Sequence, residues 1–184
     1  MTILLALNDI STQQAKPTES TMKRVHQLLD YMYTHPKDSI SFRASDMILN
    51  IHSDASYFSA GRGSSRAGGY SFLGSIPVNG QPIKLNGNIH ITCAILKLVT
   101  TSAAEAGLGA LFLNAREAKV LRITLQELRH PQPPTPIHVD NTTAVGIFNN
   151  TIKRQRSRAM EMRYFWLLYQ YCQKYLDISH QPGQ

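Results

Sequence analysis

Two short stretches, IHSDAS at residues 51–56 and IHVDN at residues 137–141, each carry an apolar, strand-like run into an aspartate. Neither Asp54 nor Asp140 has a lysine or arginine close by in the sequence to neutralise it. Carboxylates that a sheet brings side by side repel each other unless a divalent cation such as Mg²⁺ lies between them. The pair therefore predicts a metal site built by Asp54 and Asp140.

The residues around this pair predict an α/β chain. The order of expected elements is β-β-β-α-β-α-α-β, with three antiparallel strands followed by a helical crossover to a strand parallel to the first. The carboxyl ends of the first and fourth strands then become neighbours, and Asp54 should meet Asp140. Strands are expected at residues 48–54, 69–76, 89–99, 137–140 and 176–179. Helices are expected at residues 17–35, 102–130 and 141–149 and from about residue 158, with a loop at 8–16 and a glycine-rich turn at 61–69.

The long helix between the two aspartates begins with a capping-box pattern. Ser102 would accept a hydrogen bond from a first-turn amide, and Glu105 would reach back to the amide of Ser102. Apolar residues then keep one face of the helix hydrophobic until Pro131. The prolines that follow, up to Pro136, form a stiff connector into the fourth strand.

Size and composition limit the classes of protein. The chain has 184 residues, 42% of them hydrophobic, which fits one domain plus a short extension. A formal net charge of +7 favours a polyanionic partner. No apolar run reaches membrane-spanning length and no signal peptide is evident, so we expect a soluble intracellular protein, in the cytoplasm or nucleus, without a membrane partner. Cys93 and Cys172 lack zinc-site spacing and are expected to be reduced, buried thiols.

Several motifs in a fixed order make the chain resemble one family. They are HSDASY (52–57), SRAGGYSFLG (65–74), SAAEA (102–106), HPQPPTPI (130–137), VDN (139–141) and RSRAMEMRY (156–164). Over roughly residues 47–180 the chain resembles the ribonuclease H domain of Ty1/copia-type retrotransposon polyproteins. The resemblance implies a ribonuclease H-like mixed sheet, with three antiparallel strands and then parallel strands, flanked by helices. It also implies that residues 47–184 are this domain and that residues 1–46 are a linker following a reverse transcriptase region.

Enzymes of this family cleave the RNA strand of RNA/DNA hybrids with two Mg²⁺ or Mn²⁺ ions, which four carboxylates hold. By the motif match, Asp54 supplies the first carboxylate and Asp140 the third. The second should stand at position 107, where this chain has glycine. Glu105 is turned away from that direction by about 200°, and Glu117 lies about 15 Å further along the helix, so neither replaces it.

The fourth carboxylate of the family belongs to a helix after the last strand, and this sequence stops at Gln184 before it. We therefore expect a C-terminally truncated domain with a degenerate active site, inactive or impaired as a nuclease. Glu161 is interpreted as structural. The sequence leaves open whether the chain is still an enzyme, a nucleic-acid-binding module without turnover, or a retroelement relic without a selected role.

Three further groups of residues each allow a structural and a functional interpretation. The basic residues Lys153, Arg154 and Arg156 form either a solvated loop or a contact with the phosphates of a nucleic acid. His52 and His138 are interpreted as strand residues rather than metal ligands. The last long helix carries aromatic residues whose spacing favours packing over base stacking: Tyr164, Phe165, Trp166, Tyr169 and Tyr171.

Overall fold

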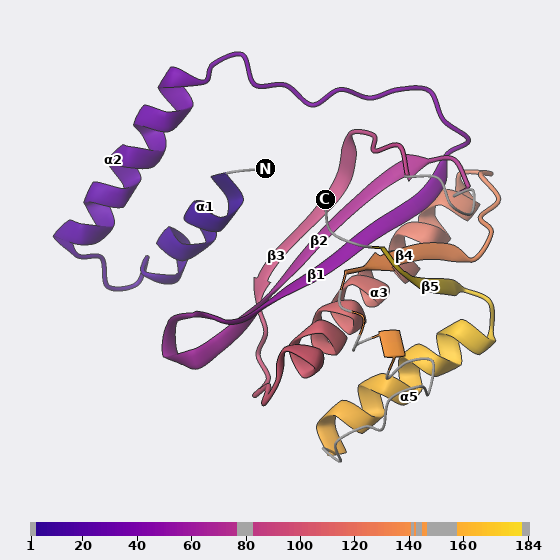
Figure 1. The fold of residues 1–184 in the computed structure, drawn as a ribbon. Coiled ribbons are helices and arrows are strands. Elements are labelled where there is room, and N and C mark those ends of the chain that lie inside the picture. The colour runs from indigo at the N-terminus through magenta and orange to yellow at the C-terminus, as the bar shows by residue number, and fades with distance from the viewer. Residues whose placement is uncertain (1–2, 77–82, 141, 143–144, 147–157, 182–184) are drawn as a thin grey trace. The chain divides into compact units, whose positions relative to one another are not determined.

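The computed structural model describes residues 3–76, 83–140, 142, 145–146 and 158–181. The chain divides into two compact units, Met1–Ile40 and Ser41–Gln184. Their secondary structure is shown in Figure 1.

The first unit is a pair of helices, α1 (Ile3–Thr12) and α2 (Glu19–Thr34), which pack against each other. The helix predicted at residues 17–35 is confirmed by α2. Its start is fixed by a reciprocal cap, in which the Thr18 hydroxyl accepts from the Thr21 amide and the Thr21 hydroxyl accepts from the Thr18 amide. The loop expected at residues 8–16 is wrong as far as Thr12, because α1 extends to that residue.

The second unit is built on one five-stranded sheet, as the α/β prediction requires. Its strands are β1 (Ile48–Ala60), β2 (Ser64–Gly74), β3 (Asn88–Ile95), β4 (Thr135–Val139) and β5 (Leu176–His180), in the order β3-β2-β1-β4-β5. The first three strands are antiparallel, whereas β4 is parallel to β1 and β5 is parallel to β4. The crossover from β3 to β4 contains helix α3 (Ala103–Glu127), and helix α5 (Arg158–Cys172) precedes β5. The predicted order of the strands and of helices α3 and α5 is confirmed, and so is the parallel β1–β4 pair. Most of the helix expected at residues 141–149 lies outside the described residues.

The predicted ends of three strands need correction. The turn expected at residues 61–69 is limited to the short 3₁₀ helix Gly61–Gly63, and Gly68 and Gly69 lie inside β2. Both glycines pair with β1 on one side and β3 on the other, and this pairing outweighs their weak intrinsic strand preference. β1 runs six residues beyond Asp54, to Ala60, and β3 ends at Ile95 rather than Val99.

The main hydrophobic core lies on one face of the sheet. Alternate residues of β1 and β4, namely Leu49, Ile51, Ile137 and Val139, join apolar residues of α3 and α5 in one cluster. Because successive strand residues point to opposite faces, His52 and His138 belong to the other face. Among the described residues, no helix is long and apolar enough to cross a membrane.

The aromatic residues of α5 divide into two groups. Tyr164 is buried, and Trp166 packs against the core with its ring 5.2 Å from the ring of Phe112, as the packing prediction requires. Phe165 and Tyr169 are 53% and 58% exposed, and Tyr171 is exposed as well, so the packing prediction is wrong for these three. Five neighbouring aromatic positions span more than one face of a helix, and only one face of α5 meets the core.

Candidate functional site

The parallel pairing of β1 with β4 brings the two aspartates together. His52 pairs with His138 and Ser53 with Val139, and Asp54 and Asp140 are the next residues of the two strands. β4 ends at Val139, whereas β1 continues because Asp54 still pairs with Gly68 of β2. Asp54 is therefore an internal strand residue and not the strand end that the sequence predicted. The pair lies just past the last rung of the parallel ladder.

The two carboxyl groups interact directly. Partial burial raises the pKa of Asp140, and the negative charge of Asp54 and a hydrogen bond with the Asp54 carboxyl raise it further. One oxygen of Asp54 also accepts a hydrogen bond from the Ala55 amide at 2.6 Å. Two carboxyl groups this close are an arrangement that a divalent cation would stabilise.

The start of α3 explains why Glu105 adds no ligand to this pair. The Ser102 hydroxyl accepts a hydrogen bond from the Glu105 amide at 3.2 Å, as the capping box predicts. The Glu105 carboxylate, however, accepts from the amide and hydroxyl of Thr101, at 2.7 and 2.8 Å, and not from the Ser102 amide as predicted. The Glu105 carboxylate is therefore used to cap the N-terminus of α3. Gly107 follows in the first turns of α3 and is buried.

The donors present fit one loosely held cation better than two. Within the described part of the chain, no group of three or more His, Cys, Asp or Glu side chains is placed to hold a metal ion. Mg²⁺ can be bound through one or two carboxylates if water fills the other positions of its octahedral shell. A site with two ions about 4 Å apart needs more oxygen ligands than Asp54 and Asp140 offer.

Asn114 of α3 is a buried residue of this region that the sequence did not reveal. Its amide nitrogen donates to the Ser53 hydroxyl at 2.9 Å and to the Gly68 carbonyl at 2.8 Å. These contacts attach the helix to β1 next to Asp54 and to the residue of β2 that pairs with Asp54. A Cβ atom at Gly69 would lie 2.1 Å from the side-chain oxygen of Asn114, so the contact requires glycine there. Gly107 lies seven residues before Asn114, about two turns, and so on the same side of α3.

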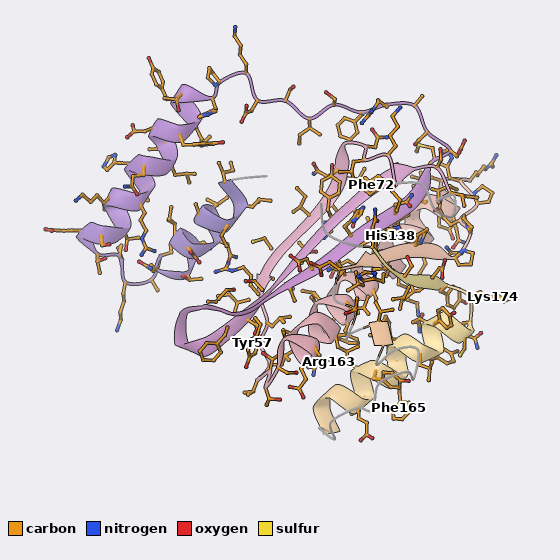
Figure 2. The ribbon with its side chains drawn as sticks, viewed as in Figure 1. Tyr57, Phe72, His138, Arg163, Phe165 and Lys174 are labelled. Carbon is orange, nitrogen blue, oxygen red and sulfur yellow. The ribbon has the colours of Figure 1, made fainter. Side chains whose placement is uncertain are left out.

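His52 and His138 pair with each other two residues before the aspartates, and strand alternation puts both on the face away from α3. Figure 2 labels His138. The two histidine rings are 5.2 Å apart, and Phe72 stacks on His52 at 5.8 Å. The Nδ1 atom of His138 is 3.0 Å from the Ser179 hydroxyl. Burial lowers the pKa of His52, and burial together with the neighbouring His52 lowers the pKa of His138 to about 4. Both are strand residues, as predicted, and are neutral at pH 7.

The basic residues Lys153, Arg154 and Arg156 lie outside the described residues. Glu161, which the sequence interpretation treats as structural, is an exposed residue in the first turn of α5.

No family model matches this chain. Over 162 residues it is 25% identical to the retrovirus-related Pol polyprotein from transposon TNT 1-94 of Nicotiana tabacum, a match that covers 88% of this chain. The chain is similar to a copia-type retrotransposon Pol polyprotein. This similarity confirms the predicted resemblance to a copia-type retrotransposon polyprotein, and the mixed sheet of three antiparallel and two further parallel strands confirms the predicted fold class. The chain spans only 11% of the length of this polyprotein.

Solved structures of ribonucleases H and of a viral protease-reverse transcriptase are also similar to the chain. LC11-RNase H1, isolated from compost and solved in complex with an RNA/DNA hybrid, is 14% identical, with 73% of this chain and 85% of that chain covered and a TM-score of 0.48. RNase H1 of Halobacterium salinarum is 15% identical, with coverages of 73% and 86% and a TM-score of 0.47. The foamy viral protease-reverse transcriptase, in complex with double-stranded DNA, is 10% identical, with coverages of 92% and 25% and a TM-score of 0.49.

The match to the Pol polyprotein is not confined to the second unit. Its 162 aligned residues exceed the length of the unit Ser41–Gln184, so the alignment extends into the helical unit Met1–Ile40.

Proposed function

We propose that residues 47–184 are a ribonuclease H-like domain descended from a nuclease of RNA/DNA hybrids, in which cleavage is lost or strongly impaired. Residues 1–46 would be the connection that follows a reverse transcriptase region. One observation carries the proposal: Asp54 and Asp140 meet at the end of the β1–β4 ladder, while the helix position from which a further carboxylate would come is Gly107. An RNA/DNA substrate would place the protein in the cytoplasm or nucleus.

The divalent ion of such a site, Mg²⁺ or Mn²⁺, would bind to Asp54 and Asp140. When bound, such an ion supplies an activated water and charge stabilisation of the leaving oxygen in nucleases. With two carboxylates in place of four, we expect weak binding of a single ion, because affinity for hard cations follows the number and charge of the oxygen ligands.

A cleavage assay tests the loss of activity. A labelled RNA/DNA hybrid is incubated with the protein in Mg²⁺ or in Mn²⁺, with Asp54→Asn as the matched control. We expect no cleavage above the level of the Asp54→Asn variant. Cleavage by the wild-type chain that Asp54→Asn abolishes would show that the two carboxylates suffice and would contradict the proposal.

A gain-of-ligand experiment tests the role of position 107. Gly107→Glu adds a carboxylate on the side of α3 that carries Asn114, whereas Gly107→Gln adds a side chain of nearly the same size without charge. We expect Gly107→Glu alone to raise Mg²⁺ affinity by about tenfold or more, as measured by titration calorimetry. Thermal melting establishes that both variants fold. Equal Mg²⁺ affinity in the two folded variants would show that a carboxylate at position 107 does not bind the metal ion.

A second candidate function is nucleic-acid binding without turnover, which the net charge of +7 favours. Replacing Lys153, Arg154 and Arg156 with glutamine should weaken the binding of a hybrid and reduce the dependence of log K on log salt by up to about 3. The control is the same charge change at three exposed cations of the helical unit and its connecting turn, Lys16, Lys23 and Arg24. An identical effect of both triple variants would argue against a dedicated phosphate contact at residues 153–156.

A further inference from the structure

The β1–β2 hairpin contains a bulge directly beyond the aspartate pair. Ser56 pairs with Arg66 and Ala60 with Ser64, so residues 57–59 of β1 lie opposite Ser65 alone. Figure 2 shows Tyr57 on this hairpin. Bulges of this kind often lie next to active sites, where they redirect side chains. Here the bulge exposes two aromatic rings, of which Tyr57 is 41% and Phe58 is 65% exposed.

Phe58 has a backbone conformation that is unfavourable for its residue type. Its φ is +56°, in the left-handed region, which costs a bulky residue about 1 kcal/mol or more. Asparagine or glycine would adopt the same conformation with less strain. Folding alone therefore gains little from an exposed phenylalanine at this position. Strained residues of this kind are found at binding sites, where the surrounding structure holds them in place.

Buried polar contacts hold the bulge. The Phe58 amide donates to the Ser65 hydroxyl at 3.2 Å, and that hydroxyl is 2.8 Å from the hydroxyl of Thr100. Both Ser65 and Thr100 are buried. The Phe58 ring lies against Gly63, where an added Cβ atom would be 2.8 Å from the ring. Tyr57 is held separately, by a hydrogen bond of 3.2 Å from its hydroxyl to the Thr101 carbonyl.

We propose that Tyr57 and Phe58 form a stacking platform for an unpaired or terminal base of a nucleic acid that approaches Asp54 and Asp140. The two rings are 5.8 Å apart and inclined by 45°. Tyr57 is three residues past Asp54, about 10 Å along the strand, which is within a few nucleotides of the carboxylates. Stacking on an aromatic ring tolerates any base, and the net charge of +7 favours a polyanion over an uncharged partner. The inference rests on the proposed nucleic-acid binding.

Binding of a fluorescent RNA/DNA hybrid with a short single-stranded overhang tests the platform. Fluorescence anisotropy is measured in EDTA, so that metal binding by the aspartates has no influence. Phe58→Asn should bind about 5- to 150-fold more weakly, the loss expected for one stacked base, with an unchanged salt slope because no phosphate contact is removed. Tyr33→Asn, which removes an exposed ring from α2, should bind as the wild type does. A 2-aminopurine in the overhang should be quenched by the wild type and not by Phe58→Asn.

Thermal melting checks that Phe58→Asn is folded, and we expect a midpoint equal to or above that of the wild type because the strain at Phe58 is relieved. Phe58→Leu, which keeps an apolar side chain but no ring, should lose affinity in the same way. If the wild type and Phe58→Asn bind equally well, the platform is refuted and the proposed function stands; a protein partner would then be the better reading of these rings. If the wild type binds no nucleic acid, the platform and the proposed nucleic-acid binding both fail.

Discussion

The repulsion between Asp54 and Asp140 lowers the stability of the folded state by an amount that depends on pH. The folded-state pKa of Asp140 is raised, so the folded chain holds this proton more tightly than the unfolded chain does. The Asp140 carboxyl therefore stabilises the folded state fully at pH values below its pKa in the unfolded chain. This contribution is lost as the pH rises through its pKa in the folded chain. We expect Asp54→Asn, which removes the neighbouring charge, to raise the melting temperature at pH 7 in EDTA. The advantage should disappear at acid pH, once the Asp140 carboxyl is protonated in both proteins. A lower melting temperature for Asp54→Asn at pH 7 would contradict this account.

His138 has the opposite dependence on pH. Its folded-state pKa of about 4 lies below the ordinary value of 6.5, so its contribution to stability is complete above pH 6.5 and is lost as the pH falls toward 4. A difference of this size corresponds to at most about 3 kcal/mol. Urea denaturation at pH 7 and pH 5 should show that His138→Gln loses less stability on acidification than the wild type. The control is His90→Gln on β3, which replaces a less buried histidine. This variant should lose as much stability between pH 7 and pH 5 as the wild type does.

At the scale of elements, the connector between α3 and β4 is fixed by two buried side chains. Arg122 of α3 donates to the carbonyls of Gln132 and Pro133 and to the Thr135 hydroxyl. The Gln132 side chain in turn accepts from the Leu49 amide at 3.0 Å and donates to the Met47 carbonyl at 2.9 Å. The Gln132 side chain thus takes the place of a strand partner for the first residues of β1, just before β4 begins. This attachment sets where β4 starts, and with it the position of Asp140.

Removal of the Gln132 amide should therefore destabilise the sheet. Gln132→Leu keeps a similar volume but leaves the Leu49 amide and the Met47 carbonyl without their partner, at about 1 to 3 kcal/mol for each buried group. We expect the free energy of unfolding in urea to fall by about 2 to 5 kcal/mol. Gln126→Leu, at an exposed position of α3, is the matched control and should change stability by less than about 0.5 kcal/mol. An equal fall in the free energy of unfolding for the two variants would show that the Gln132 hydrogen bonds do not stabilise the sheet.

At the scale of the whole molecule, the two units differ in how much they bury. In α1 and α2 only Thr21 is buried, and Leu5, Leu29, Met32 and Tyr33 are among the exposed apolar residues. The two hydrophobic clusters that the described residues form lie within the second unit. We expect residues 41–184, expressed alone, to keep a cooperative thermal unfolding transition, whereas residues 1–40 alone should unfold without one, since so short a chain buries little surface. Circular dichroism melting of the two fragments and the full chain tests this division; a fragment 41–184 without a transition would contradict it.

The sequence determined the strands, the helices α2, α3 and α5 and their order because each depends on neighbouring residues. The capped, amphipathic α3 and the strands that carry the two aspartates follow from local patterns, and a helical crossover to a strand parallel to β1 favours the placement of β4 beside β1 that the structure has. The meeting of Asp54 and Asp140 was predictable for this reason. The motifs also carried the family resemblance, which the similarity to the tobacco Pol polyprotein confirms.

Only the tertiary structure decided how far the strands run and which side chains become buried together. β1 continues past Asp54 because β2 pairs with it, and its bulge exposes Tyr57 and Phe58 because Ser65 and Thr100 hold the backbone there. The contact of Asn114 with Ser53 and Gly68 joins residues far apart in the chain. Such contacts depend on where distant segments meet in space, and local propensity, which is a property of neighbouring residues, carries no information about them.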